Sequence, residues 1–139
     1  MSQSVHAVAA SHVFDGDIVH ENAAVLVDGD KIVSVDARDE VPEAIPVRAL
    51  PDHVWLAPGF IDIQVNGGGD VLFNDAPTPA TVRAIVAAHR KFGTTALLPT
   101  LISDSREKMD AALAAVDSLV GVEPSVLGIH LEGPFLSPE

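Results

Sequence analysis

A histidine and a carboxylate stand two positions apart in LGIHLEGPF, the stretch at 127–135. Apolar neighbours and the Gly-Pro pair that follows predict a short buried strand ending in a turn. Side chains two apart on a strand share a face, so we expect His130 and Glu132 to project together. The apolar residues take the opposite face: Leu127, Ile129 and Leu131. Because α/β proteins bind ligands and metals at the carboxyl ends of strands, this pair is the first candidate site.

A second polar set lies in FIDIQVN at 60–66, which alternates strictly between apolar and polar residues. One face carries Ile61, Ile63 and Val65, and the other carries Asp62, Gln64 and Asn66. Gln64 and Asn66 could position water or substrate, or they could pack inside the protein with satisfied amides; both interpretations stay open. We expect Asp62, which lies deeper, to be structural.

The composition limits the chemistry that these residues can perform. The 139 residues are 47% hydrophobic, which predicts a globular chain with one sizeable core. There is no cysteine, so any metal must use histidine or carboxylate ligands. A formal charge of −12 would repel nucleic acid and anionic lipid, and no apolar run approaches the roughly 20 residues of a membrane span. We therefore expect a cytoplasmic protein with neither nucleic acid nor a membrane as its partner.

Residues 1–57 are predicted to form a small antiparallel β-sandwich segment. Two hairpins are expected, around DGD at 15–17 and DGDK at 28–31, because Asp-Gly lies between β-branched runs there. Prolines then restrict the following segment to edge strand or loop. They are Pro42, Pro46 and Pro51.

The remainder of the chain, 58–139, alternates strand and helix. Thr78-Pro79 predicts the start of a helix and Gly93 its end, with a strand at 94–99. The inward residues of this first helix are expected to be Val82, Ile85, Val86, His89 and Phe92. A second helix is predicted from about Ser105 to Val120, followed by a strand at 125–132. The inward residues of the second helix are expected to be Met109, Ala112, Leu113, Val116, Leu119 and Val120.

This order of elements predicts a parallel sheet covered by helices. Strands with one polar face suit a (β/α)8 barrel of the TIM type better than an open sheet, whose strands are apolar on both faces. Such a barrel takes about 250 residues. We therefore predict an α/β chain that supplies the first three βα units of a barrel, as an N-terminal fragment.

Three phrases together resemble one family. They are APGFIDIQVNGGGD at 57–70, GTTALLPTLIS at 93–103 and LGIHLEGPFLSPE at 127–139. They look like the N-terminal portion of the N-acetylglucosamine-6-phosphate deacetylase family, within the amidohydrolase superfamily. The resemblance implies a metal-dependent barrel that converts N-acetylglucosamine 6-phosphate to glucosamine 6-phosphate and acetate.

The resemblance also implies that Glu132 is a ligand of one divalent metal ion, zinc or iron. Many amidohydrolases carry His-x-His on the first strand, where this sequence has Gln64 and Asn66. Neutral amides are poor ligands for a borderline cation, so a single-metal site is expected. His130 is expected to be a hydrogen-bonded interior residue that orients Glu132.

In this family, two histidine ligands and a catalytic aspartate lie further along the barrel, so no catalytic residue is assigned within 1–139. Metal sites of this type use about three protein ligands, and the chain alone is therefore expected to be inactive. The complete protein is expected to be a homodimer or homotetramer. The alternatives are another amidohydrolase, such as an N-acetylgalactosamine-6-phosphate deacetylase or a cyclic amidase, and a non-catalytic fragment or assembly module.

The other polar residues have ordinary interpretations. Three consecutive glycines, Gly67 to Gly69, could bind an anion through backbone N–H groups, but a flexible turn is the simpler account. His89 is expected to be a buried, hydrogen-bonded histidine. Turn chemistry explains four aspartates: Asp15, Asp17, Asp28 and Asp30. Four histidines receive no role: His6, His12, His20 and His53.

Overall fold

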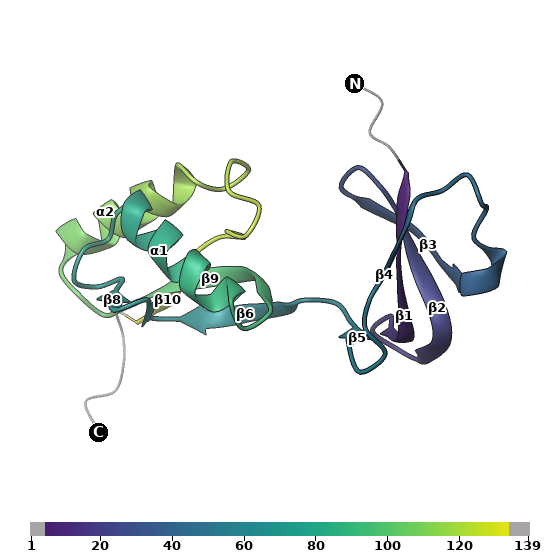
Figure 1. The fold of residues 1–139 in the computed structure, drawn as a ribbon. Coiled ribbons are helices and arrows are strands. Elements are labelled where there is room, and N and C mark those ends of the chain that lie inside the picture. The colour runs from purple at the N-terminus through teal and green to yellow at the C-terminus, as the bar shows by residue number, and fades with distance from the viewer. Residues whose placement is uncertain (1–4, 134–139) are drawn as a thin grey trace. The chain divides into compact units, whose positions relative to one another are not determined.

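A computed structural model describes residues 5–133 of the chain, which divides into two compact units, Met1–Pro58 and Gly59–Glu139 (Figure 1). The first unit is a β-sheet and the second is mixed α/β. The Gly-Pro turn expected at Gly133-Pro134 lies partly outside the described residues. Among residues 5–133, no helix has the length and apolar character that a membrane crossing requires.

The first unit is a five-stranded sheet in the order β3-β2-β1-β4, with β5 also paired to β1. The strands are β1 (His6–Phe14), β2 (Val19–Asp28), β3 (Lys31–Ala37), β4 (Val47–Ala49) and β5 (Trp55–Leu56), and a short 3-10 helix covers Arg38–Glu40. The two predicted hairpins are confirmed, because β1 and β2, and β2 and β3, pair antiparallel.

The expectation of a purely antiparallel sheet is wrong, since β4 and β5 run parallel to β1. The connection after β3 is long enough to carry the chain to the far edge of β1, which a tight turn cannot do. As expected for the segment that contains the prolines, β4 forms an edge of the sheet. Small side chains form two clusters in this unit, one around Ala7 and Ala24 and the other around Val13 and Val25.

The second unit contains a parallel sheet in the order β10-β9-β6, as the alternation of elements predicted. Its strands are β6 (Phe60–Val65), β9 (Thr94–Ile102) and β10 (His130–Glu132), and a small hairpin joins β7 (Gly67–Gly68) to β8 (Val71–Leu72). The helices are α1 (Pro79–Arg90) and α2 (Arg106–Asp117). Figure 1 shows both helices on one side of the sheet.

The core of the second unit lies between the helices and β9. Leu97 and Leu101 lie four positions apart on β9 and therefore share one face of the strand, where they are buried against residues of both helices. The same cluster also contains Val65, Phe73, Val82, Ile85, Val86, Ala112, Val116, Leu119 and Val126. The helices therefore cover one face of β9.

The predicted start of α1 is confirmed. The Thr78 side chain accepts a hydrogen bond from the Thr81 N–H at 3.2 Å, and Pro79 takes the first helical position. Gly93, with a φ of +92°, follows the helix where a residue with a side chain would be strained. Phe92 was predicted to face inward but is 81% exposed. The helix ends at Arg90, so helical spacing no longer sets the direction of Phe92.

Two inward predictions for α2 are also wrong, because Leu113 and Val120 are exposed. The helix ends at Asp117, before Val120, and the inward positions at helical spacing are taken by Ala112, Ala115 and Val116. The predicted start is confirmed, since the Ser105 hydroxyl accepts from the Lys108 N–H at 3.3 Å.

The two edge strands of the parallel sheet differ most from the prediction. The strand expected at 125–132 is regular only over His130–Glu132, with an isolated bridge between Leu97 and Val126. Ile129 packs on the core as expected. Four other apolar residues expected on helix-facing sides are exposed: Ile61, Ile63, Leu127 and Leu131. Within the described part of the chain the helices pack on β9, the middle strand, so the edge strands are less covered.

Candidate metal-binding site at the ends of the parallel strands

The two candidate sequences meet at the carboxyl ends of the parallel strands. The Gln64 side-chain Nε2 donates to Glu132 Oε2 at 3.3 Å, although the residues lie on the two edge strands with β9 between them. Glu132 is half-buried and Gln64 is exposed. The neutral amide satisfies one carboxylate oxygen and adds no competing charge. Gln64 and Glu132 therefore share one side of the sheet.

A β-bulge in β6 directs Gln64 toward this position. Asp62 pairs with Leu97 and Val65 pairs with Pro99, so two residues of β6 oppose the single residue Leu98. Asp62 Oδ1 accepts from the Gln64 N–H at 3.1 Å and holds the bulge. Bulges of this kind redirect side chains next to functional sites. Asp62 has the structural contact that the sequence led us to expect.

His130 is fixed by the backbone of the opposite edge strand. Its Nδ1 lies 2.9 Å from the Ile63 carbonyl oxygen, at the bulge. A carbonyl can only accept, so the proton of this hydrogen bond is on Nδ1. The contact joins β10, the strand that carries Glu132, to β6 across the middle strand.

Thr100 lies on β9, between the two edge strands, and was not singled out from the sequence. The residue is fully buried, and its Oγ1 accepts from the Val65 N–H at 2.8 Å and lies 3.2 Å from the Leu98 carbonyl, to which it donates. It is in register with His130. Thr100 thus supplies the ladder contact that the bulge in β6 interrupts.

Asn66 is placed near the end of β6 but is not joined to Glu132. Its side-chain Nδ2 is buried and has no hydrogen-bond partner among residues 5–133, while its backbone carbonyl accepts from the Phe73 N–H at 2.8 Å. A buried amide donor without a partner is uncommon in folded proteins. Of the four residues singled out, the structure connects Gln64, His130 and Glu132 through β6, while Asn66 Nδ2 has no partner among residues 5–133.

Glu132 is the one carboxylate in this set of residues. Within the described ranges, no group of three or more histidine and acidic side chains is arranged to hold a metal ion. A metal at Glu132 therefore fits the donor type but needs further ligands from outside these residues.

His89, the glycine run and Asp15 have structural contacts. His89 Nε2 lies 3.0 Å from the Gly67 carbonyl and is half-buried, which confirms a hydrogen-bonded histidine. The glycine run forms part of the β7–β8 hairpin. Asp15 Oδ1 accepts from the Asp17 and Ile18 N–H groups, which confirms the turn chemistry. The His20 side-chain hydrogen bond, followed by those two backbone donors, lowers the pKa of Asp15 to about 2.

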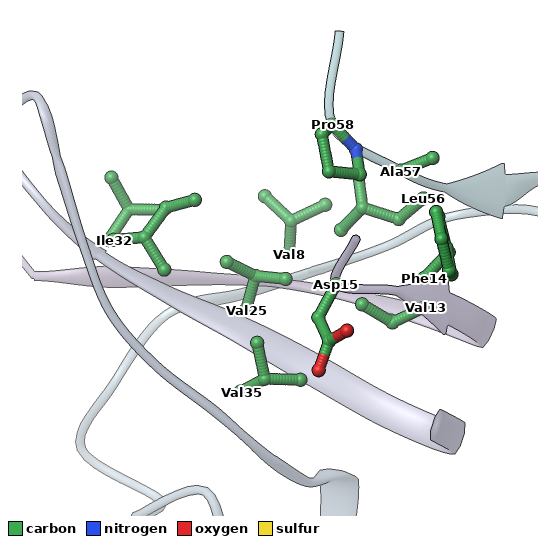
Figure 2. A pocket seen from close by; sticks show the side chains of 11 residues that line it. Val8, Val13, Phe14, Asp15, Val25, Ile32, Val35, Leu56, Ala57 and Pro58 are labelled. Carbon is green, nitrogen blue, oxygen red and sulfur yellow. The ribbon is translucent and has the colours of Figure 1, made fainter. Parts of the chain in front are cut away.

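An apolar hollow lies in the first unit and lacks the groups that catalysis requires. It has a volume of about 330 Å³ and is lined by apolar residues of β1, β2 and β3 and by Leu56 to Pro58 (Figure 2). Asp15 is the one charged residue among the side chains that line it. A single carboxylate beside apolar side chains supplies neither an acid–base pair nor a set of metal ligands.

Comparison with known proteins confirms the resemblance to deacetylases of phosphorylated amino sugars. No protein-family model matches the sequence. An N-acetylgalactosamine-6-phosphate deacetylase of Shewanella is 54% identical over 83 residues, which are 59% of this chain and 21% of that protein. An N-acetylglucosamine-6-phosphate deacetylase of Haemophilus influenzae is 34% identical over 84% of this chain and 30% of its own length.

The solved structures agree. The N-acetylglucosamine-6-phosphate deacetylase of Pasteurella multocida aligns with a TM-score of 0.90 and 33% identity, covering 96% of this chain and 35% of that protein. The chain thus resembles N-acetylglucosamine-6-phosphate deacetylase and spans about a third of the length of the relatives that it matches over most of its residues.

Proposed function

We propose that this chain is part of a metal-dependent deacetylase that hydrolyses the acetamide of N-acetylglucosamine 6-phosphate to glucosamine 6-phosphate and acetate. The observation that supports this most is the Gln64–Glu132 hydrogen bond. It joins the segments 57–70 and 127–139, which carry the resemblance, at the carboxyl ends of parallel strands. The deacetylase relatives supply the reaction class.

In this proposal the 139 residues form the first three strands and two helices of a (β/α)8 barrel. Glu132 would be one ligand of a single zinc or iron ion, and the other ligands and the catalytic aspartate would come from segments outside residues 5–133. When bound, such a metal polarises the amide carbonyl or lowers the pKa of a bound water molecule.

The residues of this chain would prepare the ligand. Gln64 donates to one oxygen of Glu132 and thereby fixes the orientation of the carboxylate, leaving the other oxygen for a metal. His130 ties the strand that carries Glu132 to the Ile63 carbonyl and limits its movement. A cytoplasmic location and a homodimeric or homotetrameric complete protein are part of the same proposal.

A chimera tests this function. Residues 1–139 would replace the aligned N-terminal third of the Pasteurella multocida deacetylase, whose fold they match closely. We expect metal-dependent release of acetate from N-acetylglucosamine 6-phosphate, reduced at least a hundredfold by Glu132→Gln, in line with the loss of a metal ligand or its orienting partner. Glu123→Gln is the matched control, because Glu123 pairs with Arg90 at 3.6 Å instead of lying at the strand ends. Equal activity of the Glu132→Gln and Glu123→Gln chimeras would contradict the proposal.

A second substrate has support from one observation. The Shewanella relative, which is 54% identical over 83 residues, is an N-acetylgalactosamine-6-phosphate deacetylase. The two sugars differ at one hydroxyl, so the ratio of kcat/KM for the two phosphates distinguishes the proposals. The measurement belongs on the complete protein that contains this chain.

A further inference from the structure

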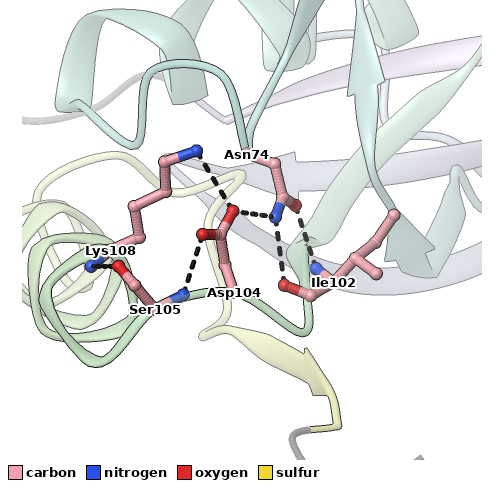
Figure 3. Close-up of polar contacts among 5 residues, drawn as sticks. All are labelled: Asn74, Ile102, Asp104, Ser105 and Lys108. Carbon is pink, nitrogen blue, oxygen red and sulfur yellow. Dashed lines mark hydrogen bonds and ion pairs between the residues drawn. The ribbon is translucent and has the colours of Figure 1, made fainter.

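Asn74 takes the place of a neighbouring strand at the end of β9. The last pair between β6 and β9 joins Val65 to Pro99, while β9 continues to Ile102. There, Asn74 Oδ1 accepts from the Ile102 N–H at 2.9 Å and Asn74 Nδ2 donates to the Ile102 carbonyl at 3.0 Å (Figure 3). A side-chain amide thus satisfies both backbone groups of Ile102, as a paired strand would.

Asp104 fixes which way this amide points. Asn74 Nδ2 also donates to Asp104 Oδ2 at 3.2 Å, and Lys108 Nζ donates to the same oxygen at 3.1 Å. Asp104 Oδ1 accepts from the Ser105 N–H at 2.8 Å (Figure 3). The Ser105 N–H, followed by Lys108 and Asn74, lowers the pKa of Asp104, so this carboxyl group is an acceptor at neutral pH. Reversing the amide would place two acceptors against Asn74 Oδ1.

Ser103, which follows Ile102 at the end of β9, contacts β10, the strand that bears Glu132. Ser103 Oγ donates to the Glu132 carbonyl at 3.1 Å, and Ile102 is in register with Glu132. Gly133 has a φ of +113°, and a Cβ there would collide with Ser103 Oγ. Glycine at 133 therefore allows the Ser103 hydroxyl to lie over the peptide that follows Glu132.

We infer that Asn74 and Ser103 are positioning residues for Glu132, holding the end of β9 from one side and the end of β10 from the other. The relevance of this positioning to metal binding rests on the proposed role of Glu132. The alternative hypothesis is that Asn74 and Ser103 only close the loop between β9 and α2. The two hypotheses predict different effects on Gln64, which is hydrogen-bonded to Glu132 but not to Asn74 or Ser103.

NMR of the 139-residue chain distinguishes the two hypotheses. The side-chain amide resonance of Gln64 reports its hydrogen bond to Glu132, and backbone amide exchange reports the Asn74–Ile102 contact. Asn74→Asp keeps the shape but removes the donor and opposes Asp104, and Ser103→Ala removes the hydroxyl. We expect both variants to move the Gln64 side-chain resonance toward that of a free glutamine. Asn74→Asp should also raise the exchange rate of the Ile102 amide about tenfold, because Asp104 and the Ile102 carbonyl repel the new carboxylate and move it away from the Ile102 N–H.

Ser118→Ala is the matched control. It removes a hydroxyl that donates to the Ala115 carbonyl at 2.7 Å at the end of α2, and it should leave the Gln64 resonance unchanged. If Asn74→Asp does not fold, Ser103→Ala decides the question by the same signal. The inference is overturned if the Gln64 resonance stays in place in every folded variant, or if it already matches free glutamine in the unmodified chain. Neither readout needs metal or substrate, so its failure is separate from failure of the proposed function.

Discussion

The amide of Gln64 and the carboxylate of Glu132 meet at 3.3 Å although 68 positions of the sequence separate them. Three structural features bring them together: the parallel pairing of both edge strands with β9, the bulge in β6, and the hydrogen bond from His130 to the Ile63 carbonyl. The contact gives Glu132 a defined orientation before any ligand arrives.

Gln64→Glu should destabilise the second unit. It places a second carboxylate beside Glu132 and removes the donor, and like charges at this distance cost roughly 1 kcal/mol when partly exposed. The difference from the unmodified chain should shrink near about pH 3, where carboxyl groups are mostly protonated. Urea unfolding at both pH values measures this. Gln64→Met is the control, since it removes the donor without adding charge, and an equal, pH-independent loss in both variants would argue against the contact.

Phe73→Ala should unfold the second unit selectively. Phe73 is completely buried in the main cluster of that unit, and deletion of a buried phenylalanine costs about 3–5 kcal/mol. Phe92→Ala is the matched control, because Phe92 is 81% exposed and its loss should change the free energy of unfolding by less than about 0.5 kcal/mol. Hydrogen exchange resolved by residue should show lost protection in α1 and α2 with protection retained in β1 and β2. Equal effects of the two substitutions would contradict the assigned core.

The Asp15–His20 contact should make the first unit sensitive to acid. The pKa of Asp15 is lowered from 3.8 to about 2, chiefly by the hydrogen bond from His20. A carboxyl group with a lowered folded pKa stabilises the fold fully above its unfolded pKa, and this contribution is lost as the pH falls from about 4 to about 2. A carbon-detected NMR titration of Asp15 should therefore show a midpoint near about 2, and His20→Ala should raise it. A midpoint at the ordinary value in the unmodified chain would be inconsistent with this contact.

The 139-residue chain by itself should release no acetate from N-acetylglucosamine 6-phosphate and should bind less than one equivalent of zinc. Glu132 is the one candidate ligand that we assign in it, and catalytic zinc sites use about three protein ligands. Metal analysis after dialysis and an acetate assay measure both quantities. Stoichiometric zinc with measurable turnover would show that ligands within this chain had been overlooked.

Local signals in the sequence predicted the parts of the fold that local chemistry controls. The hairpin between β2 and β3 follows from Asp-Gly between β-branched runs, and the start of α1 follows from Thr78-Pro79. Gln64 and Glu132 were both singled out from the sequence, each on its own strand, and the structure brings them together on one side of the sheet.

The errors arose where contacts distant in sequence decide the outcome. Phe92 is an exception with a local cause, because it fits the apolar spacing of α1 but the helix ends before it. The exposure of Ile61 and Ile63 depends on which strand the helices cover and on the bulge opposite Leu98, and neither leaves a mark in the alternating pattern. Asn74 was missed for the same reason, because its partner Ile102 is 28 positions away and asparagine after a short hairpin is ordinary turn chemistry.

The position of the metal in the chimera that carries residues 1–139 tests most directly whether Glu132 is a metal ligand. A crystal structure with anomalous diffraction at the zinc edge locates the ion independently of activity. We predict a zinc peak within about 2.0–2.2 Å of a Glu132 carboxylate oxygen, with Gln64 still donating to the carboxylate. Zinc bound at full occupancy with Glu132 outside coordination distance would contradict it.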